Sequence, residues 1–205
     1  ERLLVATARD LAASTNGITE FAIRIQIDLA DIYWERGEYQ AAKDRLSGLI
    51  LTARHIGATD LSFVGKNYLA RVLASEGELD SAQLVSEDVV GYGELAWREN
   101  PEQYYNALIE LGAVYQRKSR FEDAERVFEE TMLAMLEIGG EYHPTTLVAM
   151  NNLGNIYEQL GLYDDAEPVL EQTLQGMEIA MGLSHSQTAR ARNNLALLHE
   201  SQGNF

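Results

Sequence analysis

The chain has 205 residues, no cysteine, 46% hydrophobic residues and a formal net charge of −16. This length allows a sizeable apolar core, and the lack of cysteine excludes a disulfide scaffold and a thiol nucleophile. The negative charge argues against a nucleic-acid backbone or an anionic membrane surface as the main partner. No apolar run approaches the roughly 20 residues of a membrane span. The first residues lack the pattern of a secretion signal, so we expect a cytoplasmic location.

A leucine followed by a small residue recurs along the chain, and the last three occurrences are 42 residues apart. A turn residue follows seven positions later, and an alanine follows twelve positions later. The small residues are Ala30, Ala70, Gly112, Gly154 and Ala196; the turn residues are Gly37, Gly77, Ser119, Gly161 and Gly203; the alanines are Ala42, Ala82, Ala124 and Ala166. This spacing of small residue, turn residue and alanine, called the frame below, begins five times along the chain and indicates a structural repeat.

Each repeat unit has the features of a helical hairpin. The small residue and the later alanine suit two helices that approach closely, and the turn residue ends the first helix. The second helices carry an apolar stripe at helical spacing, as in Val127, Phe128, Thr131 and Met135. Because each hairpin has apolar surface left on both sides, neighbouring hairpins must stack into a solenoid.

In chain order, we expect a single solenoid of about nine to ten helices over residues 1–205. Its parts are residues 1–14 as the second helix of an earlier repeat, four repeats at 20–56, 60–98, 101–139 and 144–182, and residues 186–205 as the first helix of a further repeat. The solenoid would then be cut at both ends. We expect Leu195 and Leu198 to be exposed there unless another element covers them, and uncapped ends offer a route to self-association.

The first helices resemble the tetratricopeptide repeat (TPR), as "NLGNIY" at 152–157, "ELGAVY" at 110–115 and "DLADIY" at 28–33 illustrate. This resemblance implies an all-α, right-handed α-solenoid. The 42-residue period, "HPTT" at 143–146 and paired asparagines are similar to the kinesin-light-chain subclass of these repeats. His143 and Thr146 recur 42 residues later as His185 and Thr188. We expect both histidines to mark turns between repeats, with Pro144 beginning a helix.

Motifs for catalysis or cofactor binding are weak in this sequence. "GYGELA" at 91–96 matches the dinucleotide fingerprint G-x-G-x-x-A, but it falls near the end of an expected helix where the fingerprint requires a strand before a turn. The acidic groups "EDAE" and "DDAE" recur where second helices begin, and carboxylates there favour the helix dipole. No nucleophile–base pair is evident. We therefore expect no enzyme activity, no cofactor and no metal.

The function we expect is binding of a protein or peptide segment in the concave groove that the first helices of TPR solenoids line. Asparagine suits this role because its amide both donates to and accepts from an extended backbone. The resemblance to kinesin light chains implies such an asparagine ladder in the last two repeats, whereas tying neighbouring helices together is the alternative role. The groove candidates are Asn67, Tyr68, Arg71, Asn106, Gln116, Asn151, Asn152, Asn155, Arg190 and Asn194.

Arg71 and Arg190 are the groups best suited to meet a partner's carboxylate, unless nearby glutamates neutralise them. The leading interpretation is thus an interaction module of a larger intracellular protein. The subclass also occurs in signalling proteins, so the alternative is a ligand-sensing region of a STAND- or NLR-like ATPase or signalling enzyme whose catalytic domain lies elsewhere.

Overall fold

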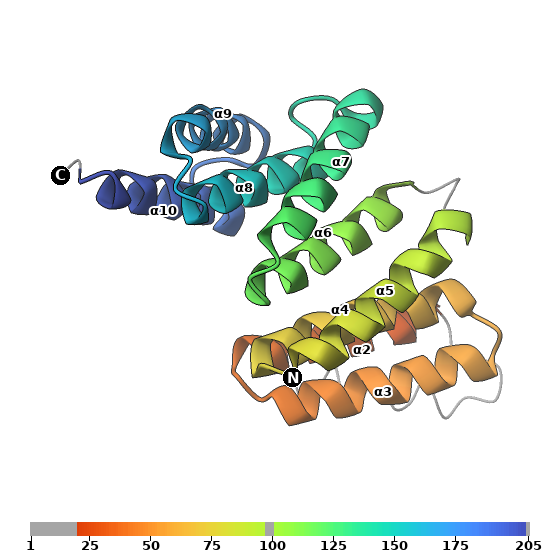
Figure 1. Ribbon diagram of the computed structural model, residues 1–205. Helices are drawn as coiled ribbons and strands as arrows, with labels where there is room; N and C mark the ends of the chain where they lie inside the picture. Colours follow the sequence, from red (N-terminus) through yellow and green to blue (C-terminus); the bar gives the residue numbers. More distant parts are fainter. Residues whose placement is uncertain (1–19, 97–100, 204–205) are drawn as a thin grey trace. The chain divides into compact units, whose positions relative to one another are not determined.

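The computed structural model describes residues 20–96 and 101–203, and these residues form nine α-helices and no strand (Figure 1). The helix expected at 1–14 lies outside the described residues. Contacts between Cα atoms divide the chain into two compact units, residues 1–92 and 93–205, with the boundary inside one helix. Each unit is described by itself below.

Within each unit the described helices follow one another through short turns, which makes consecutive helices antiparallel hairpin partners. The first unit contains α2 (Glu20–Glu35), α3 (Tyr39–His55), α4 (Thr59–Glu76) and most of α5 (Leu79–Ala96). The second contains α6 (Pro101–Arg117), α7 (Phe121–Gly139), α8 (Pro144–Gln159), α9 (Tyr163–Met181) and α10 (Ser186–Ser201).

Packing is sequential within each unit. In the first unit α3 packs against both α2 and α4, and in the second each helix from α6 to α10 packs against the next. The first helices of neighbouring repeats also touch, in the pairs α2 with α4, α6 with α8 and α8 with α10. This arrangement confirms the expected all-α solenoid of helix hairpins.

The two helices of a hairpin approach closely at the small residue of the frame. A Cβ atom added to Gly112 would lie 2.6 Å from Cε1 of Phe128, and one added to Gly154 would lie 2.6 Å from Cδ2 of Leu170. Both partner side chains are fully buried. The matching alanines of the second helices, Ala42, Ala82, Ala124 and Ala166, have no exposed surface. In these two hairpins the small residue of the frame therefore marks a position where the helices approach closely.

The turn inside each hairpin requires a left-handed backbone. Gly37, Gly77 and Gly161 have φ of 72°, 95° and 74° at this position. Ser119 takes the same conformation with φ 58°, and it is the sole non-glycine with positive φ in residues 20–96 and 101–203. A side chain in this region is disfavoured by its Cβ atom, so Ser119 is held there by the hairpin around it.

The turns between repeats in the second unit are built by histidine and threonine. The Nδ1 atom of His143 accepts a hydrogen bond of 3.2 Å from the backbone N–H two residues later, which caps α8, and Pro144 is its first residue. The hydroxyl of Thr146 donates to the carbonyl of Gly140 at 3.0 Å. His185 and Thr188 repeat both contacts before α10. The expected role of the two histidines is confirmed.

The expected exposure of Leu198 is wrong. Leu198 on α10 has no exposed surface, because it packs with Ala166 and Leu170 of α9, and Leu195 is half-buried in the same cluster. The first helix of a repeat thus covers the preceding hairpin. The large apolar side chain that α10 leaves exposed is Leu197, at 47%.

Replacing Gly154 by leucine should lower the free energy of unfolding by about 3 kcal/mol, because the new side chain overlaps Leu170 in a packed core. Urea denaturation followed by circular dichroism measures this. Gly48, a glycine inside α3 with no atom within 4 Å of a built Cβ, provides the control. Gly48→Leu should leave stability unchanged or raise it, and equal midpoints for the two variants would contradict the close crossing.

Replacing Ser119 by glycine should stabilise the chain by about 1 kcal/mol, since glycine adopts positive φ without a Cβ penalty. The reverse change at the equivalent turn, Gly161→Ser, should destabilise by a similar amount. Thermal melts of both variants test the assignment. A Ser119→Gly variant that melts below the parent would show that the serine side chain stabilises this turn.

Candidate functional site

The described residues contain no group of three or more His, Cys, Asp or Glu side chains arranged to hold a metal ion. None of their helices is both long and apolar enough to cross a membrane. The candidate residues from the sequence all lie on the first helices of the repeats. In the second unit, α8 contacts both α6 and α10. We use the name first-helix surface for the exposed and half-exposed positions of these three helices, namely Asn106, Glu110 and Gln116 on α6, Asn152, Asn155 and Glu158 on α8, and Arg190, Leu197 and Ser201 on α10.

Asn151 and Asn194 connect α8 to α10. The Nδ2 atom of Asn194 donates to Oδ1 of Asn151 at 3.0 Å. Asn151 has no exposed surface, and its own Nδ2 is buried without a hydrogen-bond partner. The sequence pattern placed Asn151 among the groove residues, and in this structure its side chain lies inside the helix packing. The hydrogen bond between Asn194 and Asn151 therefore joins the adjacent helices α8 and α10.

Asn152 and Asn155 lie one and four residues further along α8 and are half-exposed. Neither side chain hydrogen-bonds another described residue, so their amides remain available to a partner. Gln116 on α6 is also half-exposed. On the α10 side, Ser201 donates to a carboxylate oxygen of Glu158 at 2.9 Å. On the first-helix surface, the half-exposed amides without a hydrogen bond to a described residue thus include Asn152 and Asn155 of α8.

Two further candidates lie towards the beginnings of these helices. Asn106 on α6 is exposed and accepts a hydrogen bond of 3.2 Å from the Thr145 hydroxyl on α8. Arg190 on α10 is exposed, and the carboxylate of Glu110 on α6 acts on its charge. Desolvation lowers the pKa of the Arg190 guanidinium, while Glu110 acts in the opposite direction. Arg190 and Glu110 thus place opposite charges on the first-helix surface.

In the first unit, Arg71 on α4 is held by side chains from two helices. Its guanidinium carbon lies 4.4 Å from the ring centroid of Trp34 and 4.7 Å from that of Tyr68, and the group forms an ion pair with Asp31. Trp34 donates from its indole nitrogen to Ser75 at 2.8 Å. Arg71 is therefore neutralised within the unit, by an aspartate rather than by a glutamate. Cation–π contacts of this kind stabilise the pairing of α2 with α4.

Asn67 lies one helical turn before Arg71, and its Oδ1 atom is buried without a hydrogen-bond partner. The sequence candidates thus fall into two groups: Asn67, Tyr68 and Arg71 in the first unit, and the remaining seven in the second. Sequence reasoning missed the ion pair between Asp31 and Arg71. The signal was present, because these residues are 40 positions apart and so occupy equivalent places in neighbouring repeats.

Comparison with known proteins assigns the repeat. Residues 103–179 match one tetratricopeptide repeat family model, and residues 23–46 match a second. The matched residues are tetratricopeptide repeats, and the fold of the chain is that of kinesin-light-chain-like TPR solenoids. Repeats of this family are protein-interaction scaffolds and are generally non-catalytic. No curated protein matches the chain significantly.

Solved structures support the fold. BtubC (BKLC) from P. vanneervenii has a TM-score of 0.76 and 19% sequence identity, over 100% of this chain and 82% of that one. The nearly identical TPR-like repeats of a Podospora anserina putative kinesin light chain have a TM-score of 0.68 and 22% identity, over 88% and 87%. A point variant of those repeats gives 0.69 and 21%, over 88% and 86%.

The hydrogen bond between Asn151 and Asn194 should appear as a coupling free energy of about 1 kcal/mol in a double-mutant cycle of alanine substitutions, measured by urea unfolding. A cycle that pairs Asn194→Ala with Asn152→Ala is the control and should be additive, because Asn152 makes no such bond. Additivity in both cycles would contradict the tie between α8 and α10.

Proposed function

We propose that this chain is a protein- or peptide-binding scaffold module of a larger cytoplasmic protein, and that the partner segment lies across the first-helix surface of α6, α8 and α10. The observation that carries the proposal is the pair of half-exposed amides at Asn152 and Asn155, which no described residue engages. Unused donors and acceptors on a rigid helix suit recognition of another chain.

The chemistry of this surface favours an extended backbone as ligand. An asparagine amide donates to a peptide carbonyl and accepts from the next peptide N–H, which holds a segment without selecting its side chains. Asn152 and Asn155 are three residues apart and therefore lie on the same side of α8. The tie from Asn194 to buried Asn151 fixes α10 beside α8, so the two amides are presented on a preorganised surface.

Selectivity would come from the flanking groups. Leu197 on α10 offers an exposed apolar contact, and Gln116 on α6 offers a further amide. Arg190 supplies a positive group for an acidic side chain of the partner. Arginine binds a carboxylate in a planar, bidentate manner, which makes Arg190 the residue best suited to an acidic side chain.

A partner isolated by affinity capture with the 205-residue chain should bind the Asn152→Ala, Asn155→Ala double variant about thirty-fold more weakly, since the two side chains each lose a hydrogen bond that contributes about 1 kcal/mol. Isothermal titration calorimetry measures the affinity, and a thermal melt should match the parent. Gln40→Ala, which removes an exposed amide from α3, is the control and should bind normally. Unchanged affinity in the double variant would rule out this surface.

A further inference from the structure

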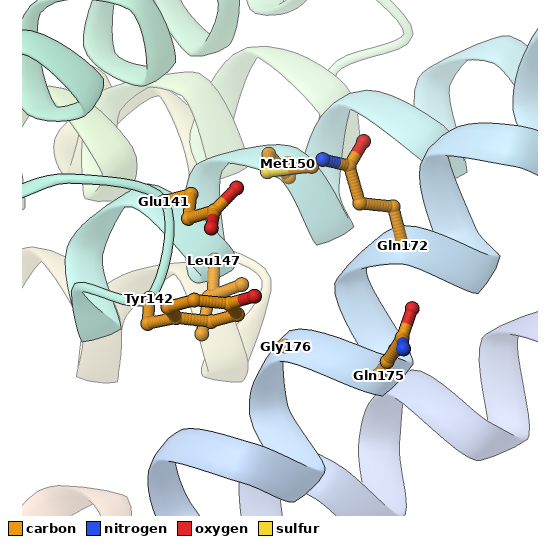
Figure 2. Close-up of a pocket in the computed structure, with 7 residues that line it drawn as sticks. All are labelled: Glu141, Tyr142, Leu147, Met150, Gln172, Gln175 and Gly176. Carbon is orange, nitrogen blue, oxygen red and sulfur yellow. The ribbon is translucent and has the colours of Figure 1, made fainter.

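A cavity of about 190 Å³ opens on another part of the second unit, between the loop that joins α7 to α8, the helix α8 itself and α9 (Figure 2). Its walls combine apolar and polar groups. The lining residues are Glu141, Tyr142, Leu147, Met150, Gln172, Gln175 and Gly176.

This cavity is separate from the first-helix surface. Leu147 and Met150 are buried on the side of α8 that meets α9, where a Cβ added to Gly176 would lie 2.5 Å from Leu147. Asn152 and Asn155 project from a different side of α8, because successive residues of an α-helix are rotated by about 100°. A ligand in the cavity and a segment on the first-helix surface do not compete for the same side chains.

The walls provide both apolar and polar groups. Figure 2 shows Glu141 and Tyr142 on the loop, opposite Gln172 and Gln175 on α9. The Tyr142 side chain is 48% exposed, so its ring is accessible. A hydrogen bond with the Glu141 carboxylate raises the pKa of the Tyr142 phenol. The cavity thus presents a carboxylate, an aromatic ring and two amides.

The negative charge around the cavity determines which ligands it attracts. The sequence has no Lys or Arg between Val127 and Ala189, and that stretch carries ten carboxylates. Glu141 forms no ion pair with any residue in the described part of the chain. Arg192, just beyond the stretch, pairs instead with Glu178 at 3.0 Å. Among the described residues, the carboxylate at the cavity therefore has no cationic partner.

We propose that this cavity binds a lysine or arginine side chain of a protein partner, at a second site independent of the first-helix surface. The alkyl stem of such a side chain packs on Leu147 and Met150, and its charged end meets the Glu141 carboxylate. The amide oxygens of Gln172 and Gln175 accept from the remaining N–H groups. The ring of Tyr142 flanks the cation, which adds a cation–π contact.

The probe for this site is the blocked tripeptide acetyl-Gly-Arg-Gly-amide, titrated into the full 205-residue chain labelled at its methionine methyl groups. The Met150 resonance should shift and saturate. An analogue with norleucine in place of arginine should leave it unchanged at the same concentrations. Glu141→Gln should weaken the arginine probe about ten-fold, because a charge-assisted hydrogen bond is lost.

Glu171→Gln is the matched control, since it removes an equal charge from an exposed position of α9 outside the cavity. It should leave affinity for the probe unchanged. Tyr142→Ala tests the second wall and should also weaken binding. An equal loss in the Glu171 and Glu141 variants would show diffuse electrostatic attraction and overturn the proposal. A Met150 shift as large with norleucine, or no saturable shift at all, would overturn it as well.

Discussion

The close crossing of two helices at one small residue is the constraint on which each hairpin depends. At Gly112 and Gly154 the space of a missing side chain is occupied by Phe128 and Leu170 from the second helix. Such a contact has one register, because a shift along either helix would place a Cβ atom where the neighbour already lies. With the inner side of each hairpin fixed in this way, helical periodicity determines which side chains of each helix face the hairpin partner.

Contacts between repeats then rely on polar groups at nearly equivalent positions. Asp31 pairs with Arg71, and Asn194 donates to Asn151; the partners are 40 and 43 residues apart, close to the repeat period. The buried hydroxyl of Thr188 similarly donates a hydrogen bond to the carbonyl of Gly182, at the end of the preceding repeat. Many polar side chains of the first helices therefore stabilise the stack, and a polar residue in this frame does not by itself indicate a binding site.

Polar residues of the first helices can either stabilise the stack or bind a partner, and this limits how far the sequence could predict the structure. The period, the hairpin turns and the buried alanines follow from the sequence, because each reflects a local packing rule. The difference between Asn151 and Asn152 does not, since both fit the frame and only the rotation of α10 against α8 decides which one is buried. The burial of Leu198 was mispredicted for a related reason, because it depends on the contact of α10 with the preceding hairpin.

The two proposed sites differ in the part of a partner that each recognises. The amides of Asn152 and Asn155 suit a backbone and are uncharged, so their binding depends little on ionic strength. The cavity beside Glu141 suits a cation, and the uniform negative charge of residues 128–189 favours its approach from a distance. Because both sites use α8, one rigid helix fixes their separation. A partner that places a basic side chain at that separation from an extended segment would bind both, and the second contact would raise its effective affinity without a change in either surface.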